Sequence, residues 1–266
     1  MRGSDLIDVD KIKESLGTKR IGSQIIIYKS TSSTNDVAAE YAKNKNNDGL
    51  VIFAEEQTKG RGRASNKWIT GKADSVLCSV ILTKCDLKPE FLSLTCAVAV
   101  AEAVGNETKI KWPNDIILHG KKVGGILAEF KKFKNHTAYI VGIGINCHQK
   151  KRDFEPELRE TATSIDIESQ TCCDRNFIAK RLLSSMEHWL QTAEKRSAKV
   201  IEEWKSLSIQ LHHRVNLIYN GRRFRGNCIG IDPEKGLIVQ LDTGSVRMFN
   251  AAHTSIDQNS PRFRLA

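Results

Sequence analysis

The sequence predicts an α+β fold, with a mixed β-sheet followed by a small β-barrel. Three observations support this prediction. Short apolar runs rich in β-branched residues recur between residues 25 and 145 and are typical of strands. From residue 174 to about residue 207 the chain is amphipathic at helical spacing, and beyond that stretch it becomes rich in strands. Strands and helices mixed in this way indicate the α+β class.

The first expected strand is Ile25 to Tyr28, and a helix is expected to begin at Thr34 with Ser33 as its N-cap. Phe91 to Val104 is typical of a buried helix. His119-Gly120 stands between two strand-like runs and predicts a tight hairpin. The other strands expected here are Leu50 to Glu55, Val76 to Leu82, Ile110 to Lys111, Ile116 to Leu118, Val123 to Phe130 and Ala138 to Ile145.

The expected domain boundary follows the amphipathic stretch, which begins at Asp174, a good N-cap, and ends near Leu207. Turn signals then occur at Asn220-Gly221, at residues 232–236 and at residues 242–244, which predicts a barrel of about 50 to 60 residues. We therefore expect an N-terminal extension over residues 1–23, a main domain over residues 24–207 and a barrel over residues 208–266. The first four residues resemble an expression-vector leader.

Composition limits the protein class but does not choose a function. The 266 residues carry a formal net charge of +10, which suits nucleic acid, anionic membrane, polyphosphate or an acidic protein partner. Seven scattered cysteines lack the paired spacing of zinc sites and favour a reducing cytoplasm. No segment is typical of a signal peptide or a membrane span. We expect a cytoplasmic protein without a bound structural metal.

Gly60-Arg61-Gly62-Arg63 is a basic, glycine-rich segment of the kind that binds anions. It lacks the Gly-Lys-Ser/Thr ending of the common phosphate loop, so a P-loop nucleotidase is not expected. Taken alone, this segment could equally be a solvated mobile loop.

Three further segments combine polar residues with a turn or with glycines. Lys111-Trp112-Pro113-Asn114-Asp115 places an aromatic residue, a proline and two polar side chains in one turn, although an ordinary turn could have this sequence. Lys122 precedes Gly124-Gly125, and residues 142–146 place glycines on one face of a strand that ends in Asn146. Glycines in strands let a ligand or another backbone approach closely, but the second strand could also serve only packing.

Together these segments resemble the biotin protein ligase family in order and approximate spacing. The resemblance covers about residues 24 to 256 and is carried by Ser33-Thr34-Asn35, Gln57, Gly60 to Trp68, Lys111 to Asp115, Lys122 to Glu129 and Gly142 to Asn146. Thr161 to Ser164 is a weaker match. The resemblance implies a catalytic domain of the class II synthetase-like type over residues 24–207 and an SH3-like barrel after it. It also implies an enzyme that activates biotin with ATP and transfers it to a lysine.

The resemblance further implies the residues that hold biotin. A cyclic urea offers one acceptor and two donors, which hydroxyl, amide and backbone groups can satisfy in an otherwise apolar pocket. The implied biotin-binding residues are Ser33, Thr34, Asn35, Gln57, Arg61, Gly62, Arg63 and Lys122.

Adenylation brings the biotin carboxylate to the α-phosphate of ATP, and two anions approach only where cations are positioned. The resemblance assigns Arg63 and Lys122 to this catalytic task, with Mg²⁺ on the leaving pyrophosphate. Asp115 is the candidate to orient or deprotonate the acceptor lysine, although an aspartate in a turn can also cap backbone. The implied ATP-binding residues are Arg61, Arg63, Trp68, Asn114, Lys122 and Asn146.

One departure from the family pattern is Ala64-Ser65-Asn66, where a glycine and a further basic residue are common. Only about 24 residues precede the first expected strand, so we expect no helix-turn-helix domain, no repressor function and no specific DNA partner. The expected partner is a biotin carboxyl carrier protein or domain, and a homodimer is possible. A lipoate or octanoyl transferase is the nearest enzymatic alternative, and a nucleic-acid-binding protein is an alternative of another class.

Overall fold

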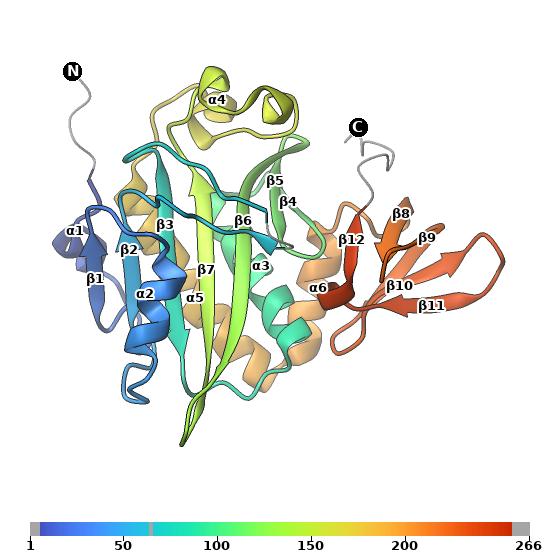
Figure 1. The fold of residues 1–266 in the computed structure, drawn as a ribbon, viewed down its shortest axis with the longest axis horizontal. Helices are drawn as coiled ribbons and strands as arrows, with labels where there is room; N and C mark the ends of the chain where they lie inside the picture. The colour runs from blue at the N-terminus through green and yellow to red at the C-terminus, as the bar shows by residue number, and fades with distance from the viewer. Residues whose placement is uncertain (1–5, 64–65, 257–266) are drawn as a thin grey trace.

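The structure, a computed structural model, describes residues 6–63 and 66–256. The four residues that resemble a vector leader lie outside these ranges. Two β-sheets organise the chain, a seven-stranded sheet in the N-terminal part and a five-stranded sheet near the C-terminus (Figure 1). This mixed architecture confirms the predicted α+β class.

The larger sheet is mixed. Its strand order is β1-β2-β3-β7-β6-β5-β4, in which β1 and β2 pair in parallel and all other neighbours pair antiparallel. Each predicted strand is present, most of them longer or shorter by a residue or two. The strands are β1 (Ile25–Tyr28), β2 (Val51–Ala54), β3 (Ser75–Leu82), β4 (Thr108–Lys111), β5 (Asp115–Leu118), β6 (Lys121–Lys132) and β7 (Thr137–Asn146).

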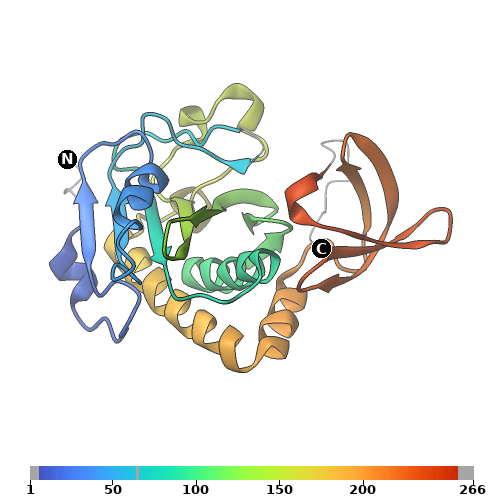
Figure 2. The same cartoon turned by 60° about the horizontal axis from the view of Figure 1, so that its bottom comes forward.

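Helices cover both faces of this sheet (Figures 1 and 2). α2 lies on one face, where Ala38 and Ala42 pack on Ile52, Ile81 and Ile140. α3 and α5 lie on the other face, over the main hydrophobic core. The helices are α1 (Val9–Lys13), α2 (Thr34–Tyr41), α3 (Pro89–Val104), α4 (Ile165–Ser169), α5 (Arg175–Lys195) and α6 (Ser197–Leu207), with short 3₁₀ turns η2 (Lys151–Asp153), η3 (Pro156–Leu158) and η4 (Ala251–His253).

The hairpin and cap predictions have mixed outcomes. His119 and Gly120 both have positive φ, 47° and 78°, and connect β5 to β6 as predicted. Asp174 caps α5 through hydrogen bonds from the N–H groups of Asn176 and Phe177. Ser33 occupies the N-cap position of α2, yet its side chain makes no capping hydrogen bond. None of the helices in the described part of the chain is long and apolar enough to cross a membrane.

The C-terminal strands form a second, antiparallel sheet in the order β11-β10-β9-β8-β12. All three predicted turn signals fall between its strands, which confirms the strand-rich C-terminal region. The strands are β8 (Arg214–Tyr219), β9 (Arg222–Asp232), β10 (Gly236–Leu241), β11 (Val246–Phe249) and β12 (Thr254–Ile256). The division of the chain at residues 23 and 207 stays a prediction.

The segment before β1 is packed against the larger domain rather than extended from it. Ile7, Ile12 and Ile21 are core residues. Burial acts to raise the pKa of the Glu187 carboxyl in α5, but hydrogen bonds from the N–H groups of residues 19–21 outweigh it and lower this pKa. These bonds fix residues 19–21 to α5.

A buried ion pair joins the same segment to the sheet. Arg175 is fully buried, and its Nη1 lies 2.8 Å from the Glu55 Oε2 and 3.1 Å from the Ser75 carbonyl oxygen. The other carboxylate oxygen of Glu55 accepts a hydrogen bond from the Ile7 N–H. One charge pair therefore connects the N-terminal segment, β2, β3 and α5.

We predict that Arg175→Met lowers the free energy of unfolding by about 3–5 kcal/mol, because it leaves the buried Glu55 carboxylate without its charged partner. The measurement is urea unfolding followed by circular dichroism. Arg152→Met is the matched control, since the side chain of Arg152 is 79 % exposed and should change stability by less than about 0.5 kcal/mol. Equal losses in the two variants would contradict the prediction.

Candidate active site

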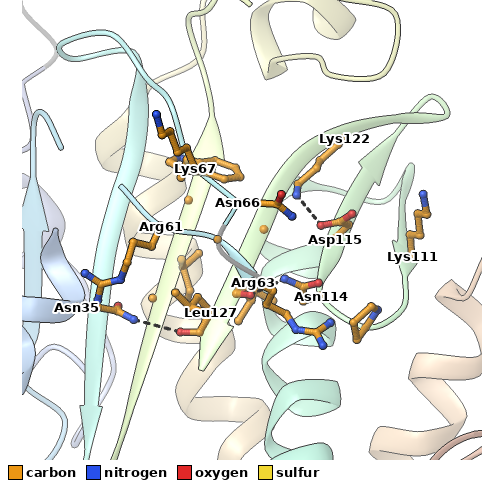
Figure 3. Close-up of a pocket in the computed structure, with 18 of the residues that line it drawn as sticks. Asn35, Arg61, Arg63, Asn66, Lys67, Lys111, Asn114, Asp115, Lys122 and Leu127 are labelled. Atoms are coloured by element: carbon orange, nitrogen blue, oxygen red, sulfur yellow. Dashed lines mark hydrogen bonds and ion pairs between the residues drawn. The ribbon is translucent and has the colours of Figure 1, made fainter. Parts of the chain in front are cut away.

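A cavity of about 320 Å³ lies on the α2 face of the larger sheet, at the N-terminus of α2. Figure 3 shows residues that line it. Its walls come from the start of α2, from residues 57–68, from the β4–β5 turn, from β6 and β7, and from β12 of the second sheet. Segments far apart in the sequence therefore meet here. The volume suits a small-molecule ligand.

Glycines form the floor of this cavity. On β7, Ile140 lies under α2, and Gly142 and Gly144 follow on the same face of the strand. A Cβ on Gly142 would lie 2.3 Å from the Asn35 Oδ1, and one on Gly144 would lie 2.5 Å from the Trp68 ring. Gly125 of β6 also faces Trp68, and a Cβ on Gly125 would lie 3.2 Å from the Trp68 ring. The expectation that the β7 glycines share one face of a strand is confirmed.

The end of the cavity nearest α2 is a network of buried polar groups. Ser33, Thr34 and Asn35 are each 3 % exposed. The Gln57 Oε1 accepts hydrogen bonds from the Thr34 N–H at 2.8 Å and the Thr34 hydroxyl at 3.1 Å. Gln57 therefore supplies the acceptor at the start of α2 that Ser33 does not. The network holds its polar groups in place before any ligand binds.

Two residues that are not among the predicted site residues complete this network. The Ser79 hydroxyl, on β3, lies 2.6 Å from the Asn35 Oδ1 and 2.7 Å from the Thr34 hydroxyl oxygen. The Asn35 Nδ2 donates to Glu129 on β6 at 2.9 Å. Ser79 carried no signal in the sequence, because a serine in an apolar strand becomes recognisable only once its neighbours are known.

The arginine loop folds back on itself. Arg61 and Lys67 form a β-bridge, and the Trp68 N–H donates to the Gly60 carbonyl at 3.0 Å. A Cβ on Gly60 would lie 2.4 Å from the Trp68 carbonyl oxygen, so this close approach requires glycine. The Gly62 N–H donates to the carbonyl of Asn66, while Ala64 and Ser65 lie outside the described residues.

The two arginines of this loop point in different directions (Figure 3). Arg61 pairs with Asp36 at 2.7 and 2.8 Å and holds the pKa of that carboxyl below its usual value. Arg63 instead donates to the Ala251 carbonyl in η4, and burial lowers its pKa. The Ala251 N–H donates to Glu90 of α3 at 2.9 Å. Arg63 thus connects the loop to the C-terminal sheet.

Lys122 and Asp115 face each other across β5 and β6, with 2.6 Å between Nζ and Oδ1 (Figure 3). A bulge places them there. Gly125 faces the cavity, so regular alternation would point Val123 into the cavity and Lys122 into the core. The register shifts between Ile116 and Ile117, and Val123 is instead a core residue while Lys122 lines the cavity. Its Nζ also lies 5.5 Å from the Trp68 ring centroid.

The β4–β5 turn is held by hydrogen bonds to a residue that is distant in the sequence. Trp112 is buried in the core, and the bond between Trp112 and Pro113 is cis. The fully buried Gln210 accepts from the Trp112 N–H at 2.6 Å and donates to the Trp112 carbonyl at 3.1 Å. Asn114 donates to the Ile126 carbonyl at 2.7 Å. Gln210 lies just before the C-terminal sheet and gave no signal in the sequence.

The structure brings nearly all of the predicted site residues together. Asn146 is the exception, because it is buried, does not line the cavity and donates to the Thr163 carbonyl at 3.0 Å. The Thr161–Thr163 segment also hydrogen-bonds the Lys122 backbone on both sides. The predicted residues that line the cavity are Ser33, Thr34, Asn35, Gln57, Arg61, Gly62, Arg63, Trp68, Asn114, Asp115 and Lys122.

Comparisons with known proteins give one family. The model of the biotin/lipoate A/B protein ligase family matches residues 27–146. The bifunctional ligase/repressor BirA of Bacillus subtilis is 34 % identical over 252 residues, which cover 91 % of this chain and 77 % of that protein. The biotin–[acetyl-CoA-carboxylase] ligase of Mycobacterium tuberculosis is 29 % identical over 261 residues, which cover 90 % and 94 % of the two chains.

A solved structure agrees with these relatives. The biotin protein ligase from Aquifex aeolicus in complex with biotin and ATP superposes with a TM-score of 0.75 at 28 % identity, covering 88 % of this chain and 99 % of that one. The similarity therefore extends over most of both chains. On this sequence and structural similarity, the chain belongs to the biotin protein ligases of the biotin/lipoate A/B protein ligase family.

Proposed function

We propose that this protein activates biotin with ATP, forming biotinyl-5′-AMP and pyrophosphate, and then transfers biotin to a lysine ε-amine of a biotin carboxyl carrier domain. The observation that carries this function is a single cavity with two chemically different ends. One end offers a preorganised polar network, and the other offers cations beside a tryptophan ring. Adenylation needs both ends, because it joins a neutral ring system with a carboxylate tail to a polyphosphate.

The charge of the cavity suits the polyphosphate. The described lining includes five cationic side chains and one carboxylate, that of Asp115; the cations are Arg61, Arg63, Lys67, Lys111 and Lys122. Bringing a carboxylate to a phosphate is opposed by repulsion that such cations offset. Lys122 stands at the centre of this proposal, because it extends over the cavity from a rigid strand.

The proposed roles of Arg61 and Arg63 require them to leave their present partners. The Arg61 side chain is 39 % exposed and the Asp36 side chain 49 %, so their ion pair is a weak surface pair that a phosphate can displace. Arg63 would exchange one neutral carbonyl for a charged phosphate oxygen, which is the stronger acceptor. The described residues of this loop, 60–63 and 66–68, would then lie against the reactants and help to exclude water.

The proposed biotin subsite is the polar network at the start of α2. Ser33, Thr34, Asn35 and Gln57 would satisfy the ureido group together with the backbone at Arg61 and Gly62. Leu127 and Ile143 supply apolar wall nearby. The biotin carboxylate would then extend toward Lys122.

The proposed nucleotide subsite is the other end. Trp68 would stack on adenine, and Asn114 would contact the nucleotide. Asn146 enters this proposal only through the backbone of Thr163, since its side chain donates to the Thr163 carbonyl and does not line the cavity. Asp115 is the single carboxylate among the described lining residues, which fits a Mg²⁺ ion held mainly by phosphates and water; that ion would neutralise the leaving pyrophosphate.

In the transfer step the acceptor amine attacks the biotinyl carbonyl carbon, the bond to the phosphate oxygen breaks, and AMP leaves. The attacking lysine must first lose a proton, since a free lysine has a pKa of about 10.4. Asp115 is the proposed acceptor of that proton. It is 26 % exposed at the cavity wall, where an incoming amine can approach its carboxylate.

The proposed macromolecular partner is the acceptor domain, and the reaction itself needs neither specific DNA nor a membrane. The net charge of +10 suits an acidic acceptor. We propose a reducing, cytoplasmic location, which the free thiol state of all seven cysteines supports.

The test of this function is biotin-dependent release of pyrophosphate from ATP, followed by mass spectrometry of a purified biotin carboxyl carrier domain. We expect pyrophosphate release with biotin and a mass increase on one lysine. Lipoate and octanoate are the competing substrates. Release with either of these but not with biotin would overturn the substrate assignment.

We predict that Lys122→Ala lowers the rate of adenylate formation by about 100- to 1,000-fold, since it removes a positioned cation from the developing charge. Lys121→Ala removes the same charge from the adjacent residue, which does not line the cavity, and should retain nearly full activity. Stopped-flow measurement of adenylate formation distinguishes the two variants. Similar losses would show that general surface charge, not position, is responsible.

We predict that Asp115→Asn slows transfer from preformed biotinyl-5′-AMP by about 100-fold, as expected for loss of a general base. Adenylate formation should fall much less. Measuring the two half-reactions separately provides the comparison. Equal losses in both would mean that Asp115 acts by positioning Lys122, its ion-pair partner, rather than by accepting the proton.

A further inference from the structure

A second group of chemically reactive side chains lies outside the cavity, past the end of β7. His148 follows β7 by two residues, Asp166 is in α4, and Cys172 lies in the link that leads into α5. α4 projects beyond the end of the sheet (Figure 1). None of the three residues lines the cavity, so the proposed ligase chemistry does not use them.

The three side chains point toward one another. The His148 Nδ1 lies 2.8 Å from the Asp166 Oδ2 and 4.0 Å from the Cys172 Sγ. One nitrogen, one oxygen and one sulfur atom all lie within 4.8 Å of each other. In a tetrahedral zinc site with bonds of about 2.0 to 2.3 Å, such atoms are separated by roughly 3.3 to 3.8 Å. Each separation therefore needs to change by only a fraction of an ångström to about one ångström.

The surroundings permit that change while keeping the group together. His148 is 5 % exposed, and its backbone N–H donates to the Asp74 carbonyl at 2.8 Å, so the backbone that carries the imidazole is held. Asp166 is tied to the same place by its N–H, which donates to the Cys147 carbonyl at 3.0 Å. Its side chain is 22 % exposed, and Cys172 is exposed, so these two ligands have room to move.

A further thiol lies beside the group. The Cys173 side chain is in hydrogen-bonding contact with the His148 imidazole and with the Cys147 thiol, and its backbone N–H donates to the Asp166 Oδ1 at 2.8 Å. Cys172 and Cys173 are adjacent in sequence, and free cysteines usually behave as small apolar side chains. The fold instead places them against a histidine and an aspartate from other segments.

We propose that His148, Asp166 and Cys172 form a binding site for Zn²⁺, with a water molecule as the fourth ligand. Thiolate and imidazole ligands select zinc over the hard cations Mg²⁺ and Ca²⁺, which prefer oxygen ligands. Binding displaces the thiol proton of Cys172 and replaces the His148–Asp166 hydrogen bond with two bonds to the metal. From the sequence we expected no structural metal, and this proposed Zn²⁺ site differs from that expectation.

The site would connect the end of β7, α4 and the start of α5. Between His148 and Asp166 the chain passes through Thr163, whose N–H donates to the Lys122 carbonyl at 2.9 Å and whose carbonyl accepts from Asn146. Bound zinc should therefore slow local opening of the segment that supports the backbone of Lys122. Bound zinc would therefore stabilise the structure around the cavity without contacting the reactants.

Titration with Co²⁺, a spectroscopic substitute for Zn²⁺, tests the proposal on the intact chain, demetallated with a chelator and kept reduced with a phosphine. We expect one equivalent to produce a thiolate-to-cobalt charge-transfer band and the d–d bands of a tetrahedral site. Zn²⁺ should abolish these bands by displacement and raise the unfolding midpoint by several degrees. An equal concentration of Mg²⁺ should do neither.

Cys172→Ser is the decisive variant, because the residue is exposed and its substitution should not disturb folding. It should lose the charge-transfer band and most of the zinc-dependent rise in midpoint. Cys85→Ser is the matched control at a cysteine outside the group and should retain both. The proposal is overturned if the unmodified protein gives no charge-transfer band, or if the band survives in Cys172→Ser.

Discussion

Three glycines on one face of β6 and β7 provide the space on which the site depends. Both faces of the sheet are otherwise covered, by α2 on one side and by α3 and α5 on the other. At Gly125, Gly142 and Gly144 the backbone itself becomes the floor. Asn35 approaches Gly142, and Trp68 approaches Gly144, more closely than a Cβ would allow, and a Cβ on Gly125 would fit only tightly against Trp68. A larger residue would fill the cavity and push these two side chains away. The polar network and the aromatic wall both follow from this arrangement.

The second determinant is a change of register. Strand alternation would bury Lys122, and one bulge in the β5–β6 pairing turns it to the cavity and sends Val123 to the core. The lysine then meets Asp115 from the neighbouring strand and stands over Trp68. Because the bulge belongs to a hydrogen-bonded sheet, the position of this cation is fixed by the backbone rather than by a flexible loop.

The C-terminal sheet takes part in the site although none of its side chains was expected there. β12 lines the cavity, Ala251 bridges Arg63 and Glu90, and Gln210 at its entry holds the Trp112 backbone. Burial raises the pKa of Glu90 and lowers that of Arg63, as expected for charges withdrawn from water at a contact between two parts of a protein. Arg63 consequently connects the arginine loop to the second sheet.

The sequence alone determined the α+β class, nearly every strand, the hairpin at His119-Gly120 and the family, because periodicity, turn residues and contiguous motifs such as Gly60 to Trp68 are local properties. Tertiary structure alone decided which polar groups pair. Ser79 and Gln210 are ordinary residues in sequence, Asn146 pairs with the Thr163 backbone instead of lining the cavity, and His148, Asp166 and Cys172 meet from three segments. Such pairings depend on contacts between residues distant in the chain, which no local pattern encodes.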